Sequence, residues 1–151
     1  MVNIQENRGR EWLKSAGVRP TRQRLTLAEL LIGDGLNRHV CAESLHETVC
    51  SNSLNVSLAT IYNTLRTFCD AGLMHEIHVD GHKSYFDTRT DDHPHFYWES
   101  SGKLTDAPKE SIRFEKLPDV PQGYNVSRVD VVIRLKDLSL IHISEPTRRR
   151  G

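Results

Sequence analysis

Hydrophobic residues recur at helical spacing through the first half of the chain. The clearest run lies between Ser57, a favourable N-cap, and Gly72, a favourable C-terminal stop. Similar spacing predicts shorter helices over Gly9–Ala16, Thr21–Ile32 and Cys41–Val49. The predicted core face of the Ser57–Gly72 helix consists of Leu58, Ile61, Leu65 and Phe68.

A β-hairpin signal follows this helix directly. Met74–Val79 and Lys83–Phe86 are strand-like, and the turn dipeptide Asp80-Gly81 lies between them. Short helices followed by a hairpin are the element order of a winged helix-turn-helix domain. We therefore expect a DNA-binding unit in the first half of the chain.

The pattern changes after His95. Phe96–Trp98 and Leu104–Asp106 are expected as strands, and Pro108–Leu117 as a helix. Apolar and polar residues then alternate over Val129–Leu135, with the period of a half-buried strand. Such a unit of about 50 residues is small for independent stability, so pairing with a second copy is expected.

The outer face of the Ser57–Gly72 helix carries hydrogen-bonding groups with little fixed charge. Side chains of this kind can read base edges in a major groove. An ordinary amphipathic surface helix is the alternative. The candidate base-reading residues are Thr60, Tyr62, Asn63 and Arg66.

Charge and cysteine content narrow the class of protein. The 151 residues carry a formal net charge of zero, which excludes a wholly nucleic-acid-coating chain, although Arg8–Arg24 is locally basic. That basic segment fits phosphate binding or a solvated helix face. Three cysteines without a Cys-x-x-Cys pair favour a reducing cytoplasm, and no apolar run reaches the roughly 20 residues of a membrane span.

Two histidines one residue apart, His93 and His95, form the strongest candidate for a ligand site. In an extended segment such side chains point to the same face, and Pro94 favours that conformation for His93. Two polar residues in a surface loop are the alternative, because short metal motifs often match by chance.

Several ordered blocks resemble the ferric uptake regulator family over nearly the whole length to Lys136. The blocks are LKSAGVRPTRQR, HVCAESL, SLATIYNTL, DAGL, GHKSYFD and HPHF. The resemblance implies a dimeric bacterial repressor in which metal occupancy orients two winged helices on palindromic double-stranded DNA.

The resemblance also implies a domain organisation of the α+β class. Residues 1–87 would form an N-terminal winged helix-turn-helix, residues 88–95 a hinge with metal or haem ligands, and residues 96–136 a small α/β dimerisation domain. Residues 137–151 resemble a translated sequencing adapter and are treated as a non-native tail, with a basic DNA-touching tail as the alternative.

Family roles carry over to particular residues. Arg19 matches a basic residue that enters a minor groove, and Tyr62 with Asn63 matches the base-reading part of the recognition helix. Nitrogen and oxygen donors suit Fe²⁺, Mn²⁺ or Zn²⁺, and haem ligation by His93 or His95 is the alternative. The implied sensory metal ligands are His39, Asp87, His93, His95 and Asp106.

Departures from the family pattern refine the expectation. Trp98 and Ser101 replace the usual Cys-x-x-Cys, so no structural Zn-Cys₄ site is expected. Arg113 and Val129 replace ligands of a second metal site. These features resemble the iron response regulator subgroup of alphaproteobacteria, which responds to haem, although Pro94 interrupts its histidine triplet.

We therefore expect a cytoplasmic, homodimeric repressor of iron and haem genes, with no membrane association and no enzyme activity. A peroxide sensor of the same family is the alternative, because Asp87 and Asp106 resemble carboxylates that hold a reactive Fe²⁺. A small metalloenzyme using a facial triad is more remote, since no glutamate adjoins a helical histidine pair. The cysteines are expected to be small buried residues that bind no metal.

Overall fold

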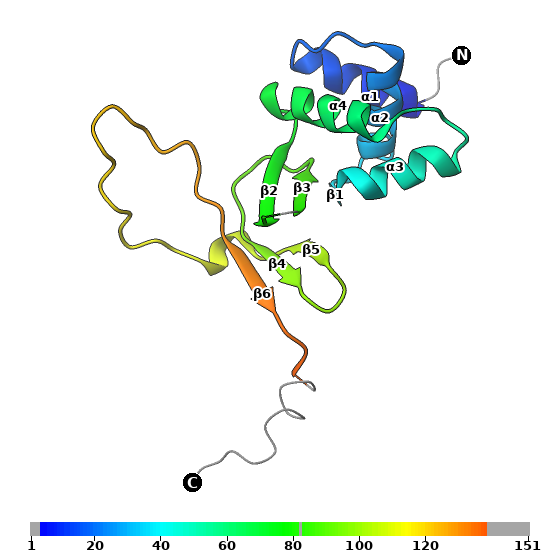
Figure 1. Ribbon diagram of the computed structural model, residues 1–151. Helices are drawn as coiled ribbons and strands as arrows, with labels where there is room; N and C mark the ends of the chain where they lie inside the picture. The colour runs from blue at the N-terminus through cyan, green and yellow to red at the C-terminus, as the bar shows by residue number, and fades with distance from the viewer. Residues whose placement is uncertain (1–3, 82, 139–151) are drawn as a thin grey trace. The chain divides into compact units, whose positions relative to one another are not determined.

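The computed structural model describes residues 4–81 and 83–138, and the chain divides into two compact units between Asp91 and Asp92 (Figure 1). The first unit contains four helices and a small sheet, and the second contains another small sheet. The expected α+β class is confirmed. The expected tail lies outside the described residues from position 139 onward.

The helices of the first unit begin where side-chain caps allow. The hydroxyl of Thr21 accepts from the backbone N–H of Arg24 at 3.3 Å, and that of Ser57 accepts from Thr60 at 3.2 Å. Gly72 has a φ of 81°, a left-handed conformation that favours glycine after a helix. The helices are α1 (Ile4–Ser15), α2 (Arg22–Ile32), α3 (Ala42–Ser51) and α4 (Leu58–Asp70).

A hydrophobic core joins these helices. Ile61, Leu65 and Phe68 on α4 are fully buried, as the periodicity predicted, while Leu58 lies at the edge of the core. The rings of Trp12 and Phe68 meet edge to face with centroids 5.3 Å apart, which fastens α1 to α4. The core thus holds one face of α4 and leaves the opposite face available.

A three-stranded antiparallel sheet completes the first unit, with strand order β1-β3-β2. Strands β2 (His75–Asp80) and β3 (Lys83–Asp87) form the expected hairpin. Strand β1 (His39–Val40) was not expected, because two residues are too few to show an alternating pattern. Its pairing places His39 opposite Asp87.

The second unit is built on the sheet β5-β4-β6. Strands β4 (His95–Trp98) and β5 (Lys103–Asp106) are antiparallel, whereas β6 (Val132–Leu135) runs parallel to β4. A strand was expected from Val129, but the ladder begins only at Val132. A parallel pair needs a long crossover connection, and residues 99–131, which include β5, supply it.

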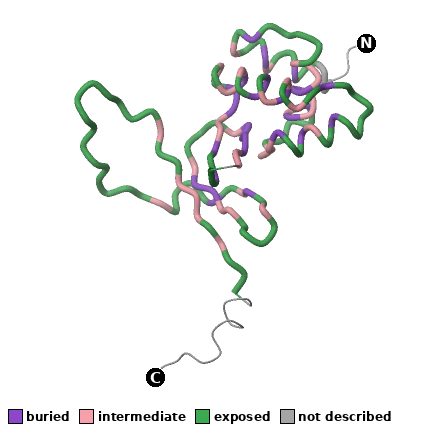
Figure 2. Tube along the Cα trace, in the orientation of Figure 1, coloured by how far each residue is buried: buried purple, intermediate pink, exposed green. Residues whose placement is uncertain are grey.

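The predicted helix over Pro108–Leu117 is wrong. Only a 3₁₀ turn, η1 (Lys109–Ser111), forms there, and Ile112 is extended. A segment this short is marginally helical without a packing partner, and Pro118 prevents it from continuing. The chain from 112 to 131 is mostly exposed, as Figure 2 shows.

The cysteines are less buried than expected. All three are free thiols, but only Cys41 and Cys69 are partly buried, and Cys50 is exposed. The expectation of buried residues is therefore met only in part by Cys41 and Cys69, and it is wrong for Cys50. The reason is its position on α3, because it follows the buried Val49 and turns to the solvent side of the helix. Every helix in the described part of the chain falls short of the length and apolar character that a bilayer crossing requires.

The core of the first unit yields a matched stability prediction. Leu65 is fully buried and Leu36 is 64% exposed, so the same substitution samples both environments. Leu65→Ala should lower the free energy of unfolding by about 2–5 kcal/mol through lost burial and a residual cavity. Leu36→Ala should change it by about 0.5 kcal/mol or less. Denaturant titrations followed by circular dichroism measure both, and equal losses would contradict the described core.

Candidate metal centre and DNA-reading face

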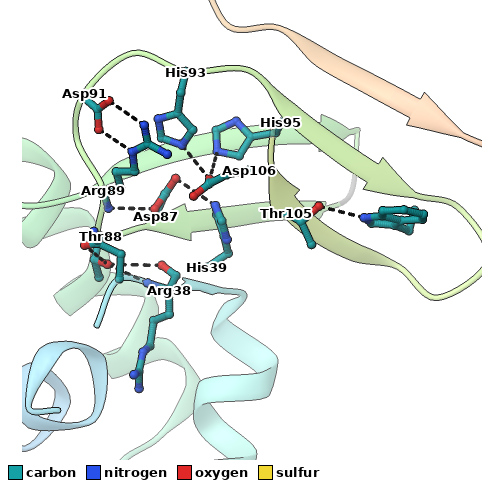
Figure 3. A network of polar contacts seen from close by, with 12 residues as sticks. Arg38, His39, Asp87, Thr88, Arg89, Asp91, His93, His95, Thr105 and Asp106 are labelled. Carbon is teal, nitrogen blue, oxygen red and sulfur yellow. Dashed lines mark hydrogen bonds and ion pairs between the residues drawn. The ribbon is translucent and has the colours of Figure 1, made fainter. Parts of the chain in front are cut away.

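His93 and His95 converge on one carboxylate in the second unit (Figure 3). The Nε2 atom of His93 lies 2.8 Å from Oδ1 of Asp106, and Nε2 of His95 lies 3.6 Å from the same oxygen. The two imidazole centroids are 4.4 Å apart. The candidate ligand atoms of these three residues all lie within 4.8 Å of one another.

Backbone pairing on both sides holds the His-Pro-His segment in place. The N–H of His95 donates to the carbonyl of Val131 at 3.0 Å, and the carbonyl of Pro94 accepts from Ala107 at 2.9 Å. In the ladder between β4 and β5, His95 is directly opposite Asp106. Register therefore brings the carboxylate to the histidines.

A second imidazole–carboxylate pair lies in the first unit. Nε2 of His39 is 3.0 Å from Oδ2 of Asp87, which is buried. The other carboxylate oxygen of Asp87 accepts the backbone N–H of Arg89 at 2.8 Å. Pairing of β1 with β3 sets this contact, since the two residues are ladder partners.

The segment that follows Asp87 is anchored to the first unit. The N–H of Thr88 donates to the carbonyl of Arg38 at 3.1 Å, and the Thr88 hydroxyl accepts from the N–H of Arg38 at 2.9 Å. Arg89 then forms a two-point ion pair with Asp91, at 2.7 and 2.9 Å. These bonds restrict the chain up to the point where the second unit begins.

The donor chemistry of both groups suits a divalent cation. Each group offers imidazole nitrogen and carboxylate oxygen, a set suited to Fe²⁺, Mn²⁺ or Zn²⁺. Trp98 and Ser101 stand where a thiolate pair would be needed, and the Trp98 indole donates to the hydroxyl of Thr105 at 2.9 Å. Arg113 and Val129, in the exposed segment, likewise offer no metal ligand.

Haem does not fit the cleft beside His93. This cleft has a volume of about 190 Å³ and is lined by the segment around His93, by Lys109 and by residues of the exposed segment from 112 to 131. Ligand pockets for drug-sized molecules usually span about 300–1,000 Å³. The residues present therefore fit a cation better than a porphyrin.

The candidate DNA-reading residues occupy the solvent side of α4. Asn63 and Arg66 are exposed, and Tyr62 is half-buried against the core. Thr60 is less available than expected, because its hydroxyl accepts from the Ser57 hydroxyl at 2.9 Å within the helix cap. Asn63 and Arg66 remain the most accessible base-reading groups on this face.

Tyr62 has a partner that the sequence did not reveal. Its hydroxyl donates to Oε2 of Glu43, on α3, at 2.8 Å. This hydrogen bond to a carboxylate raises the pKa of Tyr62, because the bond favours the protonated phenol. The guanidinium of Arg66 lies 6.0 Å from the centre of the Tyr62 ring. No periodicity marks Glu43, so only the packing of α3 against α4 identifies it.

Arg19 lies in the connection between α1 and α2. Its side chain is exposed, and its carbonyl accepts from Nη1 of Arg24 at 3.0 Å. The adjacent Pro20 restricts the backbone of Arg19 to extended conformations. The exposed guanidinium can therefore reach a phosphate or a groove without disturbing the core.

Comparison with known proteins identifies a family and individual proteins to which this chain is similar. The model of the ferric uptake regulator family matches residues 15–135. The chain is 37% identical over 120 residues to the peroxide-responsive repressor of Staphylococcus epidermidis, covering 79% of this chain and 75% of that protein. It is 37% identical over 94 residues to the peroxide-responsive repressor of Staphylococcus aureus, covering 62% of each.

Solved structures share the fold at lower identity. The ferric uptake regulator of Pseudomonas aeruginosa with manganese is 22% identical, with a TM-score of 0.61, over 85% of this chain and 97% of that one. That of Vibrio cholerae is 24% identical, with a TM-score of 0.65, over 84% and 98%. Because the family model spans most of the chain and a relative exceeds one third identity, this chain belongs to the ferric uptake regulator family of transcriptional regulators.

Proposed function

We propose that this protein is a dimeric repressor whose affinity for palindromic DNA is controlled by a divalent metal, with iron as the signal. The observation that carries the proposal is the presence of an imidazole–carboxylate group in each unit, next to the segment that joins them. Neither group alone supplies the four or more ligands that such cations usually take.

One cation would draw ligands from both units. On the family resemblance, His39 and Asp87 would come from the first unit, and His93, His95 and Asp106 from the second. A cation bound there would be coordinated by imidazole nitrogens and carboxylate oxygens of both groups and would thereby link them. The protein residues hold their donors in place beforehand, because strand register positions both carboxylates.

Control of DNA affinity follows from restricting the two units. Residues 1–87 would serve as the winged helix-turn-helix, residues 88–95 as the hinge and residues 96–136 as the dimerisation domain. Ligands on both sides of the hinge would reduce the range of orientations that two reading helices adopt in a dimer. Preorganising them for two half-sites lowers the entropic cost of binding a palindrome.

Contacts with DNA would be of two kinds: contacts to the DNA backbone that position the protein, and contacts to base edges that recognise the sequence. Arg19 would contact the backbone or the minor groove, where a positive charge gains most from counterion release. Asn63 and Arg66 would meet base edges in the major groove, together with Tyr62 and, to a lesser degree, Thr60. Specific reading therefore depends on α4, and general affinity on the basic segment before α2.

Iron is placed first because the resemblance to the iron response regulator subgroup implies control of iron and haem genes, and because Trp98 and Ser101 leave a ligand set of nitrogen and oxygen donors that suits Fe²⁺. Peroxide sensing is the second candidate, because the chain is 37% identical to a peroxide-responsive repressor. Asp87 and Asp106 provide the oxygen-rich ligand environment that such a role would use. Haem, the third candidate, lacks an enclosing cleft beside His93.

Removing both hinge histidines tests the metal-controlled function. His93→Ala combined with His95→Ala should weaken Mn²⁺ binding by about 100-fold or more, since even changes around metal ligands cost about 10- to 100-fold. The effect of Mn²⁺ on DNA affinity should disappear with it. Fluorescence anisotropy of a labelled operator, with and without Mn²⁺, measures the response, while circular dichroism confirms the fold.

The matched control replaces Cys41, Cys50 and Cys69 by serine. This triple variant should keep both the metal affinity and the DNA response, because the proposed site uses no thiolate. A histidine double variant that still responds to Mn²⁺, or a serine variant that loses the metal, would contradict the assigned ligands.

Oxidation chemistry separates the two candidate signals. If iron itself is the signal, mass spectrometry after treatment with Fe²⁺ and hydrogen peroxide should find His39 and His93 unmodified. Gain of one oxygen atom on either histidine, together with loss of DNA binding, would instead establish peroxide sensing. Zn²⁺-loaded protein treated in the same way serves as the control, because Zn²⁺ has no redox chemistry.

Arg19→Ala should weaken DNA binding for all sequences alike. The slope of log K against log salt concentration should become less negative by about 0.9, the contribution of roughly one phosphate contact. Arg113→Ala, a matched change at an exposed arginine of the second unit, should leave the slope unchanged. Equal slopes for wild type and Arg19→Ala would rule out a phosphate or groove contact at this position.

A further inference from the structure

The bond between Tyr62 and Glu43 restricts what Tyr62 can offer to DNA. A phenol hydroxyl has a single proton to donate and oxygen lone pairs that accept. At 2.8 Å that proton is donated to the carboxylate of Glu43. Hydrogen bonds to an ionised acceptor are roughly twice as strong as neutral ones, so the proton is not readily redirected.

The fold does not require this bond. Helices α3 and α4 already meet through the fully buried side chains of Val49, Ile61 and Leu65, whereas Glu43 is exposed. An exposed tyrosine–carboxylate bond adds little to stability beside such a core. Its main consequence is therefore to orient the hydroxyl of Tyr62.

Base edges in the major groove differ in the partner they need. Adenine N6 and cytosine N4 donate, whereas thymine O4 and guanine O6 and N7 accept. An oxygen that can only accept therefore pairs with adenine or cytosine. Facing thymine or guanine, it would bring two acceptors together.

We propose that Glu43 is a specificity-determining residue, which makes the Tyr62 oxygen an acceptor only and thereby selects adenine or cytosine at the base that Tyr62 meets. This inference rests on the proposed function, because it requires α4 to read DNA. Glu43 acts through Tyr62 and is a positioning residue in that sense. The neighbouring Asn63, whose amide both donates and accepts, is under no such restriction.

One further contact supports the assignment. The pKa of Tyr62 is raised by the hydrogen bond to Glu43 already described, which keeps the phenol in the protonated state that donates to the carboxylate. The guanidinium of Arg66 lies over the Tyr62 ring, 6.0 Å from its centre, and a guanidinium only donates. The helix thus presents an acceptor at Tyr62 next to a donor at Arg66.

The test measures base preference rather than affinity alone. Operator duplexes with each base in turn at every position of one half-site are titrated with Mn²⁺-loaded protein. At one position the wild type should favour adenine and cytosine over thymine and guanine by roughly three- to tenfold, the value of one net hydrogen bond. Glu43→Ala should flatten the preference at that position, because the freed hydroxyl can donate or accept.

Conservative variants distinguish this role from a structural one. Glu43→Gln retains an oxygen that accepts the tyrosine proton, but its amide can also donate to the Tyr62 oxygen, so the preference should fall between those of the wild type and Glu43→Ala. Tyr62→Phe should lose it, and adding Glu43→Ala to Tyr62→Phe should change it no further. Glu47→Ala removes an exposed acid from the same helix and should preserve the wild-type pattern.

Several results would overturn the inference. One is a change of affinity in Glu43→Ala that is uniform across all bases, and another is a wild-type preference for thymine or guanine at the position that Tyr62→Phe affects. Metal-dependent binding with base preferences identical in wild type and Glu43→Ala would contradict this inference alone. Failure of the wild type to bind any duplex would contradict both this inference and the proposed function.

Discussion

Strand register is the constraint on which this molecule depends. In each unit, a histidine and an aspartate are direct ladder partners on antiparallel strands, His39 opposite Asp87 and His95 opposite Asp106. A slip of one residue would turn either partner to the other face of its sheet and separate nitrogen from oxygen. The sheets therefore do more than complete two small folds, because they place a carboxylate beside an imidazole in each unit.

In the first unit, packing likewise determines which side chains of α4 are accessible. Apolar residues at helical spacing bury one side of α4, and that burial fixes which side remains for Tyr62, Asn63 and Arg66. Glu43 belongs to the helix that begins two residues after β1, so the strand that carries His39 and the partner of Tyr62 are neighbours along the chain. Only Cys41, the N-cap of α3, lies between β1 and the helix that carries Glu43.

Sequence patterns predicted the elements that bury a large apolar face. Ser57, Gly72 and the periodic residues between them located α4, and Asp80-Gly81 located the hairpin. Strand β1 was not predicted, because two residues are too few to show an alternating pattern. It is this strand that brings His39 to Asp87. The helix expected at Pro108–Leu117 failed because local propensity cannot sustain a short helix without a packing surface.

The site residues show the same limit. Spacing alone indicated that His93 and His95 would share a face, but Asp106 is distant in sequence and was reached only through family resemblance. The role of Glu43 was not predicted, because a hydrogen bond between the surfaces of two helices has no signature in the hydrophobic pattern of either helix. The second unit was anticipated only in part, because a parallel strand pair with an irregular crossover has no local signature.

Calorimetric titration of Mn²⁺ tests most directly the claim that one cation uses both units. The wild type, His39→Ala and Asp106→Ala are compared, so that one ligand is removed from each group in turn. A single binding event of one ion per chain, lost in both variants, is the predicted result. Two independent events in the wild type, with each variant losing only one of them, would contradict the account.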